Sequence, residues 1–581
     1  METIESISNT LNDLVWGTGI PVGEETIPLV VIALLGTGFL LTFRLGFVQL
    51  RRLAHGFAVT SGKYDDPNEP GDVSHFQALT TALSATVGIG NIAGVAIAIH
   101  WGGPGALFWM WATALLGMAT KFSEVTLAQR YRSVTATDKD AHKWEGTVSG
   151  GPMYYIERGL GRHWKPLAVL FAGILGVTAF LTGNAIQANT VADTFDRILG
   201  IPGWATGLIT TTVVAMVILG GITRIGRVTG ILAPLMAAIY VFGALAILVF
   251  NFQHIVPAVL LVFREAFNPT AGVAGTGTGA LLVTMMWGVK RGLFSNEAGQ
   301  GSAPIAHAAA KTDEPVSEGV VALVEPFIDT LVICTMTAMV IIITGVYEDR
   351  IPTEINLSGG DLTWVTQDPS SGRFHETPDA PEPLRVEGGK IASPGAVPAW
   401  HEAPVGDLFS DTAQTLPFTG VIDPARNLAT ADDGSTFGAL HADAAENGAP
   451  LTMLGFEKGL GRLGRYIVVL SVLLFAVSTA IAWSYYGDRC ANYLFGARAI
   501  MPYKLAFVAM HFVGAVLPLT VVWEMGDIFL GMVIIPNLLA LVLLSGQVKE
   551  MASSYFQRRP WLENAEVHKK FVADKRTLRG R

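Results

Sequence analysis

Residues 81–103 read Thr-Ala-Leu-Ser-Ala-Thr-Val-Gly-Ile-Gly-Asn-Ile-Ala-Gly-Val-Ala-Ile-Ala-Ile-His-Trp-Gly-Gly, and the rest of the chain is organised around this stretch. It is apolar enough to span a bilayer, yet Gly88, Gly90 and Asn91 lie in its middle. Glycine costs roughly 1 kcal/mol relative to alanine inside a helix. A break in mid-membrane exposes backbone N–H and C=O groups, which only protein, water or a ligand can satisfy. The sequence therefore predicts a discontinuous membrane helix whose break needs a partner.

The composition indicates a polytopic membrane protein. Only 15% of the 581 residues are charged, whereas a soluble domain is nearer ~25% charged. The mean hydropathy is +0.44. The two cysteines, Cys334 and Cys490, lie in or beside apolar segments and have no metal-ligand spacing. No basic n-region precedes the first apolar segment, so no signal peptide is expected.

Eleven apolar stretches approach or exceed the ~20 residues that cross a bilayer. They cover about 27–48, 79–100, 104–132, 166–193, 204–222, 229–250, 276–308, 319–346, 463–494, 503–523 and 525–547. The amphipathic piece Ile255–Phe267 is too short to span. The expected fold is all-α with 11 transmembrane helices.

The charge distribution predicts the orientation. Lys and Arg are enriched in short cytoplasmic loops. With the N-terminus outside, the basic loops around Arg51, Arg224 and Lys504 and the basic tail lie inside, while the acidic N-terminus and the acidic segment 347–460 lie outside. We expect a multi-pass protein of the cell (inner or plasma) membrane with an extracellular or periplasmic N-terminus and a cytoplasmic C-terminus.

The chain is then expected to divide into seven parts. These are an N-terminal part with one extra helix (1–78), a first five-helix repeat (79–250), an extracellular connector (251–275), two helices of a second repeat (276–346), an acidic and loosely ordered extracellular insertion (347–460), the last three helices of the second repeat (461–547) and a basic cytoplasmic tail (548–581).

A second interrupted span lies at 285–304, where Gly292, Ser295, Asn296 and Pro304 cannot all sit in one smooth apolar helix. Paired interrupted helices in two halves of a chain are typical of a transporter site. Without the first span, ten helices split into two groups of five with inverted topology, and each group opens with a broken helix. At each break one half-helix presents N–H groups and the other C=O groups, which attract anions and cations respectively. A zwitterionic amino acid together with Na⁺ suits such a site.

Three motifs resemble the alanine/glycine:cation symporter family. They are Gly88-Ile-Gly-Asn-Ile-Ala-Gly-Val-Ala96 with the Gly102–Trp111 segment, Arg291-Gly-Leu-Phe-Ser-Asn-Glu-Ala-Gly-Gln-Gly-Ser-Ala-Pro-Ile-Ala-His307, and Ser478-Thr-Ala-Ile-Ala-Trp-Ser-Tyr-Tyr-Gly-Asp488. The resemblance covers nearly all of the chain except about 347–460, where family members have a much shorter connection. It implies Na⁺-coupled (in some members H⁺-coupled) uptake of alanine, glycine and similar small amino acids. It also implies the leucine-transporter-type fold, a 5+5 inverted repeat with one extra N-terminal helix.

Given this resemblance, we expect the two breaks to form the substrate site. The amides around Ile89, Gly90 and Asn91 are assigned to the substrate carboxylate, although Gly90 and Gly94 also fit close helix packing. The residues expected to complete the substrate site are Gln187, Phe294, Ser295, Asn296 and Trp483. Trp483 is expected to limit the pocket volume and so to favour alanine and glycine over leucine.

A Na⁺ site is expected beside the first break. Ser478 and Thr479 would supply hydroxyl oxygens, and Ser84 and Val87 would supply backbone carbonyls. Oxygen-only ligation suits a hard cation. The alternative for the two hydroxyls is a hydrogen bond back to their own helix.

Several charged residues have less specific interpretations. Glu297 is an intramembrane carboxylate, costly unless paired, and is expected to pair with Lys290 or Arg291 or to take part in ion coupling. His307 is expected to be an isolated interfacial or packing histidine. Lys121, near the cytoplasmic end, is expected to be an interfacial anchor, the alternative being a gating ion pair with Arg130 and Glu124.

Other functional classes fit less well. A channel would need a continuous polar pore or repeated filter rings, whereas the sequence shows two asymmetric breaks. An enzyme would need a metal cluster, a nucleophile elbow or a Walker loop, and the sequence contains none. The chain is thus expected to be a transporter whose partners are a small amino acid and the lipid bilayer, with no nucleic acid.

Overall fold

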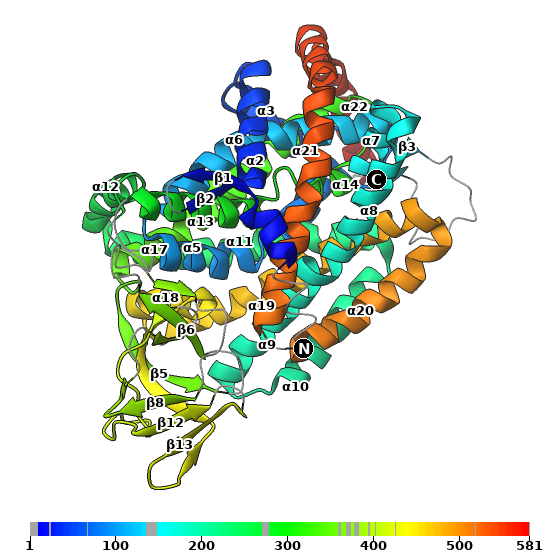
Figure 1. Cartoon of the computed structure of the whole chain (residues 1–581). Helices are drawn as coiled ribbons and strands as arrows, with labels where there is room; N and C mark the ends of the chain where they lie inside the picture. Colours follow the sequence, from blue (N-terminus) through cyan, green and yellow to red (C-terminus); the bar gives the residue numbers. More distant parts are fainter. Residues whose placement is uncertain are drawn as a thin grey trace.

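The computed structural model describes residues 10–579 apart from residues 23–24, 67, 135–147, 270–277, 358–361, 368–373, 377–382, 393–395, 401–402, 424–425 and 518. The predicted N-terminal part, connector, insertion and tail therefore lie partly outside the described residues. The protein is mostly helical, with a lobe of β-strands at one end of the helical body (Figure 1).

Helices lie at all of the predicted spans. They are α2 (Leu29–Arg44), α4 (His75–Thr86) with α5 (Val95–Gly102), α6 (Ala106–Tyr131), α8 (Lys165–Phe180) with α9 (Ile186–Leu199), α10 (Gly203–Ile218), α11 (Gly221–Phe250), α13 (Thr278–Asn296) with α14 (Ala303–His307), α15 (Pro315–Ala322) with α16 (Val324–Pro326) and α17 (Thr335–Thr344), α19 (Arg462–Phe495), α20 (Ile500–Val516) and α21 (Leu519–Arg558). The remaining helices of eight or more residues are α3 (Val48–Thr60), α7 (Pro152–Gly159), α12 (Ile255–Glu265), α18 (Gly448–Leu460) and α22 (Trp561–Arg579).

Among the described residues, six helices are long and apolar enough to cross a membrane, or up to eight if each of two bent pairs forms one span. This is the pattern of a polytopic membrane protein. The count of 11 transmembrane helices stays a prediction. The predicted boundary at residue 523 is wrong, because α20 ends at Val516. Leu517 precedes Pro518 and has an extended backbone with ψ 155°, as expected for a residue before proline.

Both predicted breaks are present. The axes of α4 and of the segment that contains α5 differ by 54°, and the π-helical turn η2 (Gly90–Gly94) lies between the two helices. The second break separates α13 from α14, and Glu297, Gly299 and Gly301 in it all have positive φ. Two further π-turns, η4 (Leu181–Ala185) and η6 (Phe327–Cys334), lie in other spans. Such turns inside helices are frequent at functional sites.

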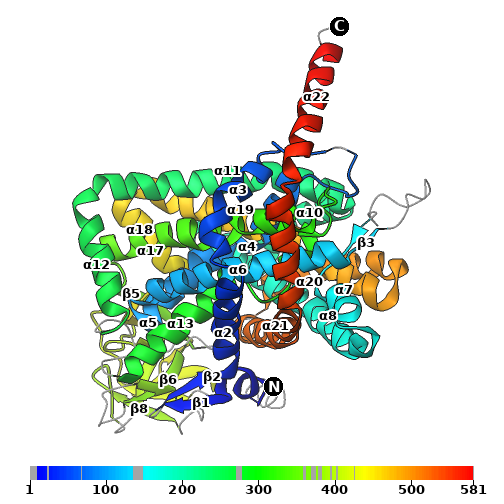
Figure 2. The same cartoon turned by 90° about the horizontal axis from the view of Figure 1, so that it is seen from above.

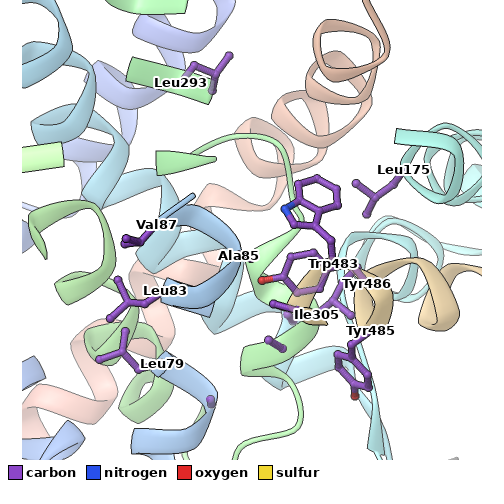
Figure 3. Close-up of a cluster of buried hydrophobic side chains, with 14 of the residues drawn as sticks. Leu79, Leu83, Ala85, Val87, Leu175, Leu293, Ile305, Trp483, Tyr485 and Tyr486 are labelled. Atoms are coloured by element: carbon purple, nitrogen blue, oxygen red, sulfur yellow. The ribbon is translucent and has the colours of Figure 1, made fainter. Parts of the chain in front are cut away.

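The helices pack around the breaks through small residues. A Cβ atom at Gly288 of α13 would lie 2.5 Å from the Ala106 carbonyl oxygen of α6, so these two helices touch at the backbone. The main buried cluster joins α4, α8, α14 and α19, and the side chains of Leu83, Ile305, Trp483 and Tyr486 belong to it (Figure 3).

The described residues of the predicted insertion are more regular than the loosely ordered domain that the sequence indicated. One antiparallel sheet has the strand order β14-β13-β12-β8-β9 and another β11-β10-β6-β7. The strands are β5 (Arg350–Asn356), β6 (Leu362–Gln367), β7 (Phe374–Glu376), β8 (Leu384–Glu387), β9 (Lys390–Ile391), β10 (Ala396–Trp400), β11 (Ala403–Pro404), β12 (Gly420–Asp423), β13 (Leu428–Ala431), β14 (Thr436–Phe437) and β15 (Ala439–Ala445). Strand β15 pairs with β5 over seven residues, and a separate buried cluster that includes Leu384, Phe418 and Ile422 gives the lobe its own core.

Short antiparallel pairs also join β1 (Gly19–Val22) to β2 (Glu25–Pro28) and β3 (Ser133–Val134) to β4 (Val148–Ser149). Helix α18 falls within the range 347–460, yet it packs on α17, α19 and η2. Its Thr452 hydroxyl donates to the Ile92 carbonyl oxygen at 2.9 Å. Helix α18 therefore connects the β-lobe directly to the first break.

Candidate functional site

The two breaks meet at Asn91. Its side-chain nitrogen donates to the Ser295 hydroxyl of the second broken helix at 3.0 Å and to an Asp329 carboxylate oxygen at 2.6 Å. Its side-chain oxygen accepts the Gly88 N–H at 2.9 Å. The side chain thus satisfies a backbone donor that the interrupted helix leaves free, and at the same time it joins the two broken helices. Neither Asn91 nor Ser295 is exposed.

The reasoning from sequence missed Asp329. This carboxylate is fully buried in η6 and accepts hydrogen bonds from the Ser295 and Thr330 hydroxyls, both at 2.7 Å, as well as from Asn91. An acidic residue in the apolar segment 319–346 was the available signal, because a carboxylate in a membrane helix is costly without partners. Asp329 is the third member of the junction between the breaks.

The predicted substrate residues lie in contact across the junction. The Ile89 N–H points at the Gln187 side-chain oxygen 3.4 Å away. A Cβ atom at Gly90 would lie 2.9 Å from the Phe294 ring, so that ring covers the break closely. Asn296 donates to the Thr330 hydroxyl and accepts the Ala298 N–H at 3.0 Å, which places it in the support of the second break. The arrangement brings backbone amides, an amide side chain and an aromatic ring together around the first break.

Trp483 lies on α19 beside the second break. Its indole N–H donates to Glu297 at 3.0 Å. A Cβ atom at Gly183 in η4 would lie 2.2 Å from the indole ring, so the ring is held between α19 and this π-turn. Figure 3 shows the side chains of Trp483 and Tyr486 next to each other in the buried cluster. Trp483 therefore forms a wall between the second break and the fourth predicted span.

The predicted cation residues converge on the end of α4. The Thr479 hydroxyl donates to the Ser84 carbonyl oxygen at 3.0 Å, and the Ser478 hydroxyl lies 3.4 Å from the same oxygen. Ser478 also donates to its own helix, at the Phe475 carbonyl, as the alternative interpretation expected. Val87 caps the end of α4 and is buried. The candidate cation ligands are all oxygen atoms, the ligands that a hard cation such as Na⁺ prefers.

A Cβ atom at Gly88 would lie 2.5 Å from the Thr479 hydroxyl and 3.3 Å from the Gln187 side-chain oxygen. The predicted substrate amides and the predicted cation ligands are therefore adjacent on the same short backbone segment.

The prediction that Glu297 pairs with Lys290 or Arg291 is wrong. Both basic side chains pair with Asp527 of α21, each at 3.0 Å. Glu297 instead accepts hydrogen bonds from Trp483 and from the Ser302 hydroxyl. Its backbone has φ +56°, which turns the chain at the break.

The predictions that His307 is isolated and that Lys121 is an interfacial anchor are also wrong, because both side chains belong to a buried ionic network. His307 contacts Glu318 at 2.5 Å and lies 3.4 Å from Glu325, and Lys121 donates to Glu325 at 2.8 Å. His75 at the start of α4 contacts the second oxygen of Glu318. The network ties the start of α4 and the end of α14, which both lie away from the breaks, to α6, α15 and α16. None of its members is more than 2% exposed.

Comparison with known proteins finds relatives that match nearly the whole length of the chain. The sequence model of the sodium:alanine symporter family matches residues 1–367 and 420–570. The unmatched segment, 368–419, is shorter than the departure of about 347–460 that the motifs indicated.

The sodium/alanine symporter AgcS of Methanococcus maripaludis is 38% identical over 557 residues, which cover 95% of this chain and 98% of that protein. A Bacillus subtilis protein named for sodium/proton-dependent alanine carriage, YrbD, is 31% identical and covers 92% of this chain and 89% of its own length. The probable sodium/glutamine symporter GlnT of the same species is 29% identical and covers 96% and 92%.

The buried ionic network makes a stability prediction. Replacing Lys121 by Met removes the lysine partner of Glu325 and leaves His307 as its remaining basic neighbour, and breaking one partner of a buried pair costs about 3–5 kcal/mol. We expect Lys121→Met to lower the thermal unfolding midpoint in detergent strongly, and Lys121→Met with Glu325→Gln to recover most of the loss.

The matched control is Lys458→Met, which removes an exposed pair with Asp349 and should cost less than about 1 kcal/mol. Equal midpoints for Lys121→Met and Lys458→Met would contradict the structural role of the network.

Proposed function

Because the chain belongs to the sodium:alanine symporter family, we propose that it couples inward Na⁺ movement to the uptake of small neutral amino acids, alanine and glycine, by alternating access. Family and relatives are transporters, so the protein is a cation-coupled amino-acid symporter and not an enzyme. The proposal that Na⁺ is the coupling ion and that alanine and glycine are the substrates rests chiefly on one observation. This is the junction of Asn91, Ser295 and Asp329 between two interrupted helices.

The substrate binds at the first break in this proposal. The amides of Ile89 and Gly90 receive the substrate carboxylate, because free N–H groups of an interrupted helix attract anions. Gln187, which faces the Ile89 N–H at 3.4 Å, turns its amide to the substrate. Ser295 and Asn296 supply polar groups from the second break, with Asp329 as the carboxylate nearest to the junction.

The proposed selectivity for small substrate side chains follows from two aromatic rings that pack closely at the breaks. Phe294 lies against Gly90, and Trp483 is held rigidly against Gly183. A side chain larger than a methyl group would have to displace one of these rings. Alanine and glycine fit without that displacement.

The cation binds beside the substrate. Its ligands are the carbonyl oxygens of Ser84 and Val87 and the hydroxyls of Ser478 and Thr479. The short contact between Thr479 and the Ser84 carbonyl supports this assignment, since the cation would replace a hydrogen bond that already brings the two oxygens together. Na⁺ binding would fix α19 against the end of α4 and so shape the adjacent substrate site.

Two specific alternatives remain distinguishable. H⁺ coupling would use a buried carboxylate, and Asp329 at the junction is the observation that favours it. A channel would show flux without saturation. In either symport mechanism we place the N-terminus outside and the C-terminus in the cytoplasm, on the basis of the basic loops.

The direct test is uptake of labelled alanine into proteoliposomes under separately imposed Na⁺ and H⁺ gradients, with a panel of competing amino acids. We expect saturable uptake driven by an inward Na⁺ gradient, competed by glycine and poorly by leucine. Uptake driven by an H⁺ gradient without Na⁺ would favour the H⁺ alternative, and non-saturating, Na⁺-independent flux would reject symport.

A substitution tests the cation site. We expect Thr479→Ala to raise the Na⁺ concentration for half-maximal uptake about tenfold or more, since a lost hydrogen-bonding group to a charge costs about 1.5–3 kcal/mol. Thr479→Ser should restore the wild-type value because it keeps the hydroxyl.

The matched control is Ser484→Ala on the same helix, whose buried hydroxyl donates to its own helix, at the Ile481 carbonyl. An unchanged Na⁺ dependence in Thr479→Ala would remove Thr479 from the ion site.

A further inference from the structure

A cavity of about 420 Å³ lies where α2, α3 and α21 meet, away from the two breaks. Helix α2 ends at Arg44, and α3 leaves it at an angle of 79° after a turn in which Gly46 and Phe47 have positive φ. Helix α21 lies alongside α2 (Figure 1 and Figure 2). Its lining includes Arg44, Gly46, Arg51, Arg52, Lys549 and Phe556.

Four of these side chains are cationic, and no acidic residue lines the cavity. In the part of the chain that the structure describes, Arg44, Arg51, Arg52 and Lys549 form no ion pair. Arg44 donates to the Ser545 hydroxyl at 3.0 Å and Arg51 to the Gly46 carbonyl at 3.2 Å. The Arg52 guanidinium lies 4.0 Å above the centre of the Phe556 ring. The cavity is therefore a concentration of positive charge whose counter-charge does not come from the described protein.

A basic residue close to the cavity does have an acidic partner. Arg558, also on α21, makes two hydrogen bonds to the Glu314 carboxylate, at 2.8 and 3.0 Å. The four cavity cations thus repel one another without such compensation, and an anion between them would relieve the repulsion. Guanidinium groups bind phosphate oxygens with two parallel hydrogen bonds, so several of them around one space suit a phosphate group.

The cavity lies at the end of an apolar surface. On α2, Phe39 and Phe43 are 52% and 65% exposed, and on α21, Leu539 and Leu543 are 41% and 51% exposed. On α2 the stripe reaches Arg44 directly after Phe43. On α21 it reaches Ser545, which accepts the hydrogen bond from Arg44, two residues after Leu543. An apolar helix surface that ends in basic side chains marks the depth at which the bilayer changes from acyl chains to headgroups.

We propose that this cavity binds the phosphate headgroup of an anionic phospholipid, with its acyl chains along the exposed apolar residues of α2 and α21. Basic pockets between membrane helices bind such headgroups. A free phosphate ion shares the headgroup chemistry but makes no use of the apolar stripes. The headgroup would join α2 and α3 to α21, and α21 also carries Asn537, whose amide donates to the Gly299 carbonyl in the second break at 2.9 Å.

The test is phospholipid retention by the purified full-length protein, measured by native mass spectrometry after delipidation and addition of phosphatidylglycerol or phosphatidylcholine. We expect the wild-type protein to retain phosphatidylglycerol, and Arg44→Gln/Arg51→Gln/Lys549→Gln to reduce the apparent affinity at least tenfold. The double variant Arg44→Lys/Arg51→Lys should retain part of the binding, because it keeps the positive charge but loses the paired guanidinium donors.

The control is Arg224→Gln/Arg227→Gln/Arg498→Gln, which removes three exposed cations elsewhere and should bind phosphatidylglycerol as the wild type does. Equal retention of phosphatidylglycerol by the wild type and the cavity variant would overturn the proposal. So would equal retention of both lipids, or displacement of phosphatidylglycerol by inorganic phosphate at the same concentration. A cavity variant that elutes as an aggregate is replaced by Arg51→Gln alone, for which we expect a smaller loss in the same direction.

Discussion

The constraint that governs this protein is the absence of water in the bilayer core. Every backbone N–H and C=O group there needs a partner, and two interrupted helices leave several without one. The structure satisfies them with side chains from other helices. Asn91 accepts the Gly88 N–H, and Glu124 and Asn537 bond the Gly299 N–H and carbonyl. The polar network is thus a requirement of the breaks, and it gathers the groups that can bind a substrate.

The same arrangement brings the proposed substrate and cation groups together. The segment between Ser84 and Asn91 faces α19 through Thr479, α9 through Gln187 and α13 through Ser295. In the proposed mechanism, a cation that draws α19 toward α4 acts on the backbone whose amides are proposed to hold the amino acid. Coupling between the two ligands would then need no long pathway, because the two proposed sites share one short piece of chain.

The sequence predicted both breaks and most helices, since glycine and polar residues within apolar stretches are local signals. An acidic residue within an apolar stretch was a signal for Asp329, but the sequence did not show that this carboxylate meets Asn91, because the π-turn that brings them together leaves no pattern in the residues around it. It misjudged His307, Glu297 and Lys121 because their partners lie on other helices, up to 204 residues away for Lys121 and Glu325. The strands between Arg350 and Ala445 were missed because they are short and separated by irregular segments.

The central claim is that the amino acid and Na⁺ bind at adjacent sites on the first broken helix and stabilise each other there. Equilibrium binding of radiolabelled alanine to the purified protein across a range of Na⁺ concentrations tests it most directly, together with the reciprocal titration of Na⁺ binding against alanine. The account predicts that Na⁺ tightens alanine binding and that alanine tightens Na⁺ binding by the same factor. Alanine binding that does not change with Na⁺ would contradict it.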